Sequence, residues 1–177
     1  MFRAALTLVA SCLALSTSTD SRPVSATYIS HTDIQSTLSR SPAASGSDQP
    51  VRVVDLGALG YNLGVGVVSR PKGAKPSAPV EHDDVTEIYH VLKGSGELVT
   101  GGALVDAAPR SSDSPSVMKV NGPSQTGSSI RGGEVRHLSS GDVVIIPAGV
   151  PHWFSQIDQS LTYVVVRVDP RKVIAVQ

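Results

Sequence analysis

Residues 141–156, GDVVIIPAGVPHWFSQ, are the stretch from which the fold can be inferred. A Gly-Asp turn leads into four β-branched residues, Val143–Ile146, a composition that favours a buried β-strand. A Pro-Ala-Gly-Val-Pro turn ends the strand, and its prolines fix the backbone φ and offer no N–H for a further sheet bond. His152 follows directly, beside Trp153. Because the backbone before it is held in one conformation, we expect His152 either to bind a ligand or to cap the core.

From residue 51 onward the chain consists of short β-rich runs separated by turn residues. Lys-Gly, Gly-Gly, Asn-Gly-Pro and Ser-Gly sequences separate the runs. The candidate strands are 51–56, 61–69, 86–92, 95–100, 116–120, 134–138, 142–147, 152–157 and 161–168. Many short strands at this spacing, with almost no helical periodicity, predict an all-β sandwich or barrel. The length of 177 residues predicts a single domain.

The predicted layout has three parts. Residues 1–26 are predicted to be a signal peptide, residues 27–50 a linker or N-terminal arm, and residues 51–177 the barrel. The arm ends in SRSPAASGSDQP, which is rich in Ser, Pro and Gly. Within the barrel, residues 101–133 contain few β-rich runs and are predicted to be an insertion between its two halves.

The N-terminal segment has the features of a secretory signal. Arg3 precedes the apolar run 4–15, which is too short to span a bilayer and suits the core of a signal peptide. Val24-Ser25-Ala26 fits the small-residue cleavage pattern, and Cys12, the only cysteine, lies inside the apolar run. We therefore expect a secreted or periplasmic protein whose mature chain has no disulfide and no cysteine nucleophile. A retained apolar helix and a lipidated Cys12 are the alternatives.

The charge balance argues against two classes of partner. Lys+Arg and Asp+Glu number 15 each, so there is no electrostatic case for nucleic acid or an anionic membrane, and a small molecule is the expected partner. The sequence has neither a G-x-S-x-G nucleophile elbow nor a phosphate-binding glycine loop followed by Lys-Ser/Thr. Gly64 and Gly66 lie in a β-rich run and predict a bulge or a close approach of the backbone.

A second candidate constellation lies in residues 81–96, EHDDVTEIYHVLKGSG. His82 precedes a predicted strand in which Glu87, Tyr89 and Val91 alternate onto one face, with His90 on the other. A carboxylate on the same face as Val91 is costly to bury unless it is paired or coordinated. If this face points inward, Glu87 is a ligand or a buried partner; if it points outward, Glu87 is an ordinary exposed carboxylate.

Both stretches resemble the two motifs of the cupin superfamily, in the form that small single-domain, cupin-2-like members have. The second family motif is Gly, five residues, Pro, one, Gly, two, His, three, Asn, and this chain has Gly141, Pro147, Gly149, His152 and Gln156. The first motif is His-x-His, three or four residues, Glu, six residues, Gly, and this chain has Val80, His82, Glu87 and Gly94. Val80 thus replaces the usual first His, and Gln156 replaces the usual Asn.

The resemblance implies a small double-stranded β-helix, or jelly-roll, barrel with a metal inside one end. It implies that His82, Glu87 and His152 are the metal ligands. Two imidazoles and one carboxylate suit a divalent transition metal, Fe, Mn, Zn or Ni, and leave positions open for a substrate oxygen or water. A barrel cap is the alternative for His152, and Asp84 is a candidate replacement for the missing ligand. Because many cupins pair through barrel edges, a homodimer is also expected.

Four further residues are candidates for the site. Tyr89 is the candidate catalytic residue, since a phenol near a metal can act as a general acid or base. Phe154, Gln156 and Tyr163 are candidates for the substrate pocket, and strand alternation places Gln156 on the same face as His152. Packing inside the barrel is the alternative for the aromatic residues.

The fold leaves the function open between three classes. The first is a metal-dependent enzyme, a lyase, isomerase or dioxygenase, that acts on a small oxygenated organic molecule. The second is a non-catalytic cupin that binds a sugar or another small molecule, an alternative that the substitution at Val80 supports. The third is an interaction or storage β-barrel with a vestigial site.

Overall fold

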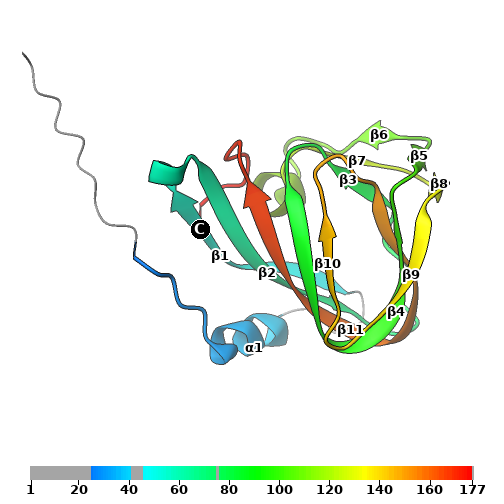
Figure 1. Cartoon of the computed structure of the whole chain (residues 1–177), viewed down its shortest axis with the longest axis horizontal. Helices are drawn as coiled ribbons and strands as arrows, with labels where there is room; N and C mark the ends of the chain where they lie inside the picture. Colours follow the sequence, from blue (N-terminus) through cyan, green and yellow to red (C-terminus); the bar gives the residue numbers. More distant parts are fainter. Residues whose placement is uncertain (1–24, 41–45, 75, 177) are drawn as a thin grey trace, which may run out of the picture.

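A computed structural model of the chain describes residues 25–40, 46–74 and 76–176 (Figure 1). The predicted signal segment lies outside these ranges except for its last two residues, and so does Cys12. Export and a secreted or periplasmic location therefore stay predictions. Within the described ranges, no helix has the length and apolar character that a membrane span requires.

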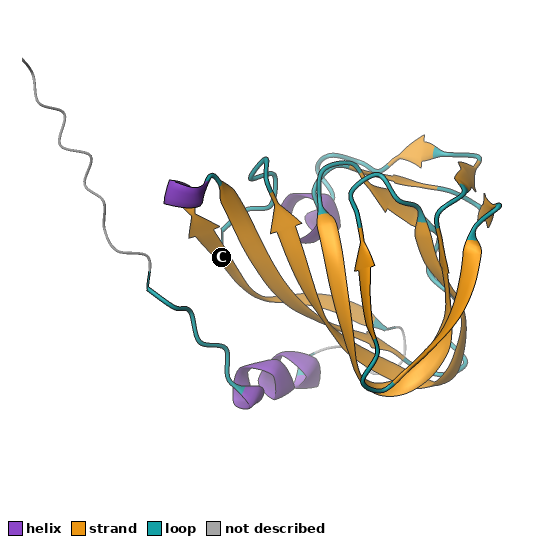
Figure 2. Cartoon of the chain, in the orientation of Figure 1, coloured by secondary structure: helices purple, strands orange, loops and turns teal. Residues whose placement is uncertain are grey.

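Strands dominate the described residues (Figure 2). Helix α1 (His31–Ser39) begins with a capping box, in which the side chains of Ser30 and Asp33 each accept a hydrogen bond from the other's backbone N–H. A 3-10 turn covers Gly57–Leu59, and a π-helical turn covers Val117–Asn121. The strands are β1 (Ser47–Leu56), β2 (Tyr61–Arg70), β3 (Val80–His82), β4 (Thr86–Thr100), β5 (Ala103–Val105), β6 (Ala108–Pro109), β7 (Ser124–Thr126), β8 (Ser129–Arg131), β9 (Glu134–Ser139), β10 (Val143–Ile146) and β11 (His152–Asp169).

Two long strands, β4 and β11, organise the sheet because each takes part in both of its layers. In one layer the order is β1-β2-β11-β4-β10, with β11 contributing residues 161–169. In the other layer the order is β9-β4-β11-β3-β7-β6, with β11 contributing residues from His152 onward. All these pairings are antiparallel, and β5 and β8 form a separate two-stranded sheet. The two layers curve toward each other (Figure 1), and the predicted all-β jelly-roll class is confirmed.

The main hydrophobic core lies between the two layers. In β4, Glu87, Tyr89 and Val91 are buried while His90 and Leu92 are exposed. The face on which alternation placed Glu87, Tyr89 and Val91 therefore points inward. Helix α1 lies against β1 and β2. The core cluster consists of Val68, Tyr89, Val91, Leu98, Leu138, Ile146, Phe154, Leu161, Tyr163 and Val165.

The structure corrects several expected elements. The predicted strands 86–92 and 95–100 are one continuous strand, and so are 152–157 and 161–168. Residues 116–120 are largely the π-helical turn rather than a strand, and β1 begins at Ser47 rather than at residue 51. Strand β10 is only half buried, because Val143 and Ile145 point outward with 61% and 64% of their surface exposed.

The predicted insertion at residues 101–133 is partly built into the main sheet. Strand β7 pairs with β3, and β6 pairs with β7. The insertion thereby extends one layer of the barrel, and its π-helical turn reaches the interior, where Val117, Val120 and Asn121 are buried.

Gly94, the last residue of the first motif, has a steric reason to be glycine. Its φ is +82°, and a Cβ at this position would lie 2.8 Å from the Cα of Leu161 on β11. Gly141 also has a positive φ, +95°, but a Cβ there would meet nothing within 4 Å. Both positions disfavour an L side chain, and only Gly94 adds a clash with neighbouring backbone.

We predict that Gly94→Ala lowers the free energy of unfolding by about 2–5 kcal/mol, since backbone strain and overpacking add. The matched control Gly141→Ala carries only the strain, about 1–2 kcal/mol. Urea unfolding followed by circular dichroism measures both values. Equal losses in the two variants would show that the close approach of Gly94 to β11 is unimportant.

Candidate metal centre

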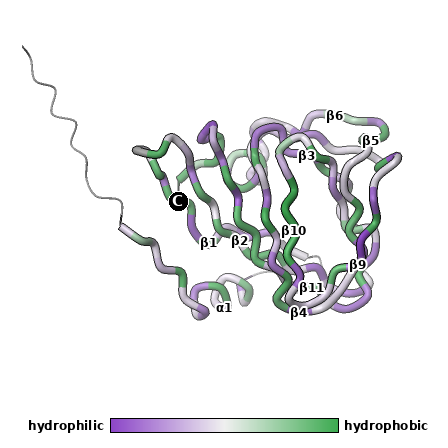
Figure 3. Tube along the Cα trace, in the orientation of Figure 1, coloured by the Kyte–Doolittle hydropathy of each residue, from purple (hydrophilic) through white to green (hydrophobic). Residues whose placement is uncertain are grey.

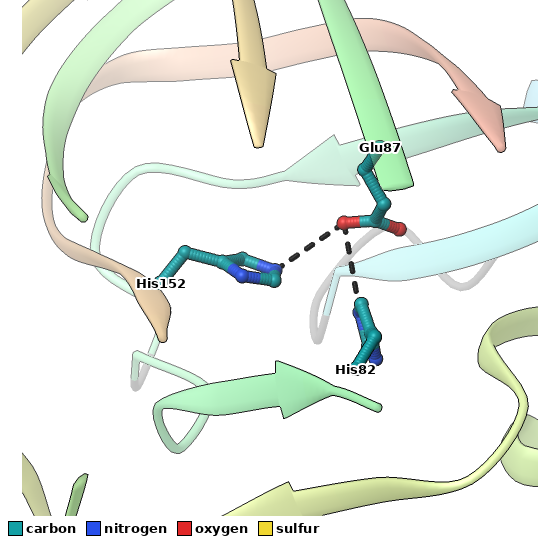
Figure 4. A group of neighbouring side chains, drawn as sticks. All are labelled: His82, Glu87 and His152. Atoms are coloured by element: carbon teal, nitrogen blue, oxygen red, sulfur yellow. Dashed lines mark ion pairs between the residues drawn. The ribbon is translucent and has the colours of Figure 1, made fainter. Parts of the chain in front are cut away.

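Three buried side chains from three different strands converge at one end of the barrel (Figure 4). His82 is the last residue of β3, Glu87 lies near the start of β4, and His152 is the first residue of β11. Glu87 Oε2 lies 3.5 Å from His82 Nε2 and 3.2 Å from His152 Nε2. One potential ligand atom from each residue lies within 4.8 Å of the others. The two motifs thus meet in space although 46 residues separate Gly94 from Gly141.

Backbone pairing brings the three residues together. His152 is the register partner of Val80 on β3, and Ile146 is the register partner of Glu87 on β4. The turn between β10 and β11 is tied to β3 as well, because Gly149 N–H donates to the carbonyl oxygen of His82 at 2.8 Å. The proline- and glycine-containing turn therefore fixes the position of His152 relative to the other two residues.

Hydrogen bonds at the far ring nitrogens set the tautomer of both histidines. His152 Nδ1 lies 3.0 Å from the carbonyl oxygen of Val150, which can only accept, so Nδ1 carries the proton. His82 Nδ1 lies 2.9 Å from Ser124 Oγ, whose own proton goes to the carbonyl oxygen of Gly122. His82 Nδ1 is therefore the donor to Ser124. In a neutral imidazole, this leaves the lone pair of Nε2 pointing at Glu87 in both cases.

Glu87 stays ionised although it is buried. Burial on its own raises the pKa of this carboxyl group, but the charge of Arg167 and the contacts with His82 and His152 hold it well below its usual value. Arg167 Nε donates to Glu87 Oε1 at 2.8 Å, and Tyr89 Oη donates to Oε2 at 2.6 Å. Burial lowers the pKa of His82, which favours its neutral form.

The donor set fits a divalent cation. The Nε2 atoms of two histidines and one carboxylate oxygen face a common point, and with both imidazoles neutral all three atoms can donate a lone pair to a cation between them. Arg167 donates a hydrogen bond to Oε1 and thereby orients Oε2 toward the histidines. Residues that hydrogen-bond to metal ligands commonly orient them in this way. His82, Glu87 and His152 are the residues that could hold the ion.

Arg167 and Asp48 were not among the candidate residues. Arg167 Nη2 donates to Asp48 Oδ2 at 2.6 Å, so one guanidinium connects Glu87 with a carboxylate on β1. A signal for Arg167 exists in the sequence, since alternation from Tyr163 and Val165 places it on the inner face of an apolar strand. Asp48 falls in the predicted linker and Ser124 in the predicted insertion, and no pattern in the sequence marks either as a site residue.

Tyr89, Phe154 and Tyr163 all face the centre. Each is buried and lines one cavity of about 520 Å³ together with His82, Glu87 and His152. The rings of Tyr89 and Tyr163 lie 4.4 Å apart between centroids, and Phe154 lies 5.6 Å from Tyr163. Burial, followed by the charge of Glu87, raises the pKa of Tyr89 well above its usual value, so this phenol keeps its proton.

The prediction for Gln156 is wrong. The register between β11 and β4 shifts between Phe154 and Gln156, so Ser155 is an extra residue that inverts the alternation. Gln156 is therefore exposed and donates to Asp158, whereas Ile157 takes the inward position and lines the cavity.

The remaining candidates lie elsewhere. His90 and His31 are exposed, and His137 pairs with Asp158 at 3.2 Å on the surface. Asp84, considered as a replacement ligand, pairs with Arg171 at 3.0 Å. Val80, at the position of the missing His, lines the cavity and presents an apolar wall there.

Comparison with known proteins shows the family. The cupin family model matches residues 76–177, which is more than half of the chain, and the chain belongs to this family. No curated protein sequence matches the chain.

Several solved structures share the fold at low sequence identity. DMSP lyase DddQ from Ruegeria pomeroyi is 22% identical with a TM-score of 0.41, and the match covers 62% of this chain and 40% of that one. Oxalate decarboxylase from Bacillus subtilis is 16% identical with a TM-score of 0.47, and the match covers 73% of this chain and 26% of that one. KdgF from Halomonas sp. is 19% identical with a TM-score of 0.43, and the match covers 75% of this chain and 85% of that one. The chain thus spans well under half the length of the first two proteins, and likeness at this level concerns the fold alone.

Proposed function

We propose that this cupin binds a divalent transition metal at His82, Glu87 and His152 and is an enzyme that acts on a small oxygenated organic molecule. The observation that carries the proposal is the convergence of the Nε2 atoms of two buried histidines on the buried, ionised carboxylate of Glu87. Iron, manganese, zinc and nickel are the candidate metals, because each accepts two imidazoles and a carboxylate.

When bound, such a metal polarises a substrate oxygen or water at its open positions. Val80 supplies no donor where the family usually has a histidine, so this chain offers fewer protein ligands than the full motif. The cavity beside the three residues has room for a small molecule, since ligand pockets commonly measure about 300–1,000 Å³.

Tyr89 is the candidate proton donor. Its phenol is buried, keeps its proton and already forms a hydrogen bond to Glu87 Oε2 at 2.6 Å. A protonated phenol at the cavity wall can pass its proton to a substrate atom. The hydrogen bond to the ionised carboxylate of Glu87 holds the phenol in position for this transfer. This arrangement favours lyase or isomerase chemistry, in which a proton moves at carbon or oxygen.

We predict that the full chain takes up about one equivalent of a divalent transition metal. His152→Ala and Glu87→Gln should each lower occupancy more than about tenfold, because loss even of an outer partner costs about 10–100-fold in affinity. Elemental analysis of protein purified after reconstitution measures the content.

His90→Ala is the matched control, because His90 is exposed on the opposite face of β4. It should retain the occupancy of the unaltered chain. Full occupancy in both His152→Ala and Glu87→Gln, or no uptake by the unaltered chain, would disprove the metal assignment.

We predict that the metal-loaded protein exchanges carbon-bound hydrogen of a suitable substrate for solvent deuterium. A panel of small oxo acids, hydroxy acids and neutral sugars, followed by proton NMR in D2O, tests this. Tyr89→Phe should slow exchange about 100-fold or more at unchanged metal content, since general acid–base groups typically contribute about 10²–10⁴-fold. Saturable binding with neither exchange nor conversion would support the non-catalytic alternative.

We also propose that the protein is a homodimer that forms through β10. In the described residues β10 pairs only with β4, so its other edge is open. Val143 and Ile145 point outward on this strand, which is strongly hydrophobic in Figure 3. An open strand edge with exposed apolar side chains favours association with a second copy.

Ile145→Glu is expected to convert the dimer to a monomer in light scattering coupled to size-exclusion chromatography, because it buries a charge in the interface. Val135→Glu is the control, since Val135 is 58% exposed on β9 in the other layer. A monomeric unaltered chain, or dissociation by Val135→Glu alone, would contradict the assignment to β10.

A further inference from the structure

We propose that the cavity recognises a small organic acid, with Arg70 binding its carboxylate. This inference adds the substrate class to the proposed function. It rests on the proposed function only for the end of the ligand that faces the metal centre. The recognition end is defined by residues that take no part in the His/Glu/His cluster.

Arg70 is a cation in the cavity wall that forms no hydrogen bond or ion pair with a carboxylate in the described part of the chain, although the charge of Asp48 acts on it. It is the last residue of β2 and is half-buried. Its Nε donates to Tyr163 Oη at 3.2 Å and its Nη1 to Ser77 Oγ at 2.8 Å, both neutral acceptors. The guanidinium carbon lies 5.2 Å from the ring centroid of Phe154 and 5.8 Å from that of Tyr163, so aromatic faces hold the group in place.

The charges around the cavity favour an anion. The two carboxylates that line it, Asp48 and Glu87, are both bonded to Arg167. Arg110 also lines the cavity, and its Nη2 donates to the neutral Ser116 Oγ at 2.9 Å. Glu87 and Asp48 share the one cation Arg167, so with Arg70 and Arg110 the region has three guanidinium groups against two carboxylates and a net positive charge. A guanidinium fork matches a carboxylate geometrically as well as by charge.

The wall between the metal centre and Arg70 is continuous. Tyr89 bonds to Glu87, its ring contacts Tyr163, and Tyr163 bonds to Arg70. Two tyrosine rings therefore separate the cluster from the cation, and a ligand that reaches both needs a chain of several carbons.

Calorimetric titration of the metal-loaded full chain with matched six-carbon probes tests the inference. D-gluconate has the carboxylate, and D-sorbitol lacks the carboxylate. Gluconate should bind at least about tenfold more tightly than sorbitol, because the carboxylate adds a charge-assisted hydrogen bond. Equal affinity for gluconate and sorbitol, or tighter binding of glucose 6-phosphate than of gluconate, would overturn the inference.

Variants of Arg70 test its role. Arg70→Gln should abolish the preference for gluconate over sorbitol, and Arg70→Lys should restore part of it. Arg131→Gln is the control, since Arg131 is exposed on β8. A similar loss in Arg131→Gln, or unchanged preference in Arg70→Gln, would disprove the assignment.

Metal analysis of the same samples separates this inference from the proposed function. Arg70→Gln should keep its metal, because Arg70 contacts none of the three cluster residues. A chain that loads metal but does not prefer gluconate disproves the substrate class alone. A gluconate preference without metal uptake disproves the metal proposal and leaves the recognition end in place.

Discussion

The contact between Glu87 and Arg167 is the interaction on which the interior of the barrel depends. The two residues are direct register partners on β4 and β11, and both are almost fully buried. Neither could be buried alone at acceptable cost, since removing one partner of a buried pair typically costs about 3–5 kcal/mol. Together they keep a carboxylate ionised at the centre of an apolar strand pair.

The surrounding sequence accommodates this pair. A Cβ at Gly66 on β2 would lie 3.0 Å from Arg167 Nη1, and a Cβ at Gly64 would lie 3.5 Å from Arg167 Cβ. The two glycines therefore leave the space that the guanidinium occupies, which confirms the prediction that they mark a close approach. Through Arg167 the pair reaches Asp48 on β1, and through Tyr89 it reaches the aromatic residues of the core.

Motif spacing predicted the position of His82, Glu87 and His152 because turns and strand pairing act over short distances. Alternation predicted correctly that Tyr89 shares the face of Glu87, but it failed for Gln156, since one extra residue at Ser155 inverts the positions that directly follow. No local pattern reports such a bulge. Alternation does place Arg167 on the inner face of its strand, but its partners Glu87 and Asp48 lie 80 and 119 residues away, and no local pattern reports these pairings.

The residues of the proposed metal centre and Arg70 lie in different parts of the chain. The three cluster residues, Tyr89 and Tyr163 all fall within residues 76–177, the part that the cupin family model matches. Ser47, Asp48 and Arg70 precede it, on β1 and β2. The family match therefore covers the proposed metal centre but not Arg70, the residue proposed to bind the carboxylate of the ligand. Strand β2 pairs with β11, so Arg70 is attached to the same strand that carries Arg167. Under this proposal, a substitution at the end of β2 changes the ligand while the pairing of β4 with β11 keeps the centre intact.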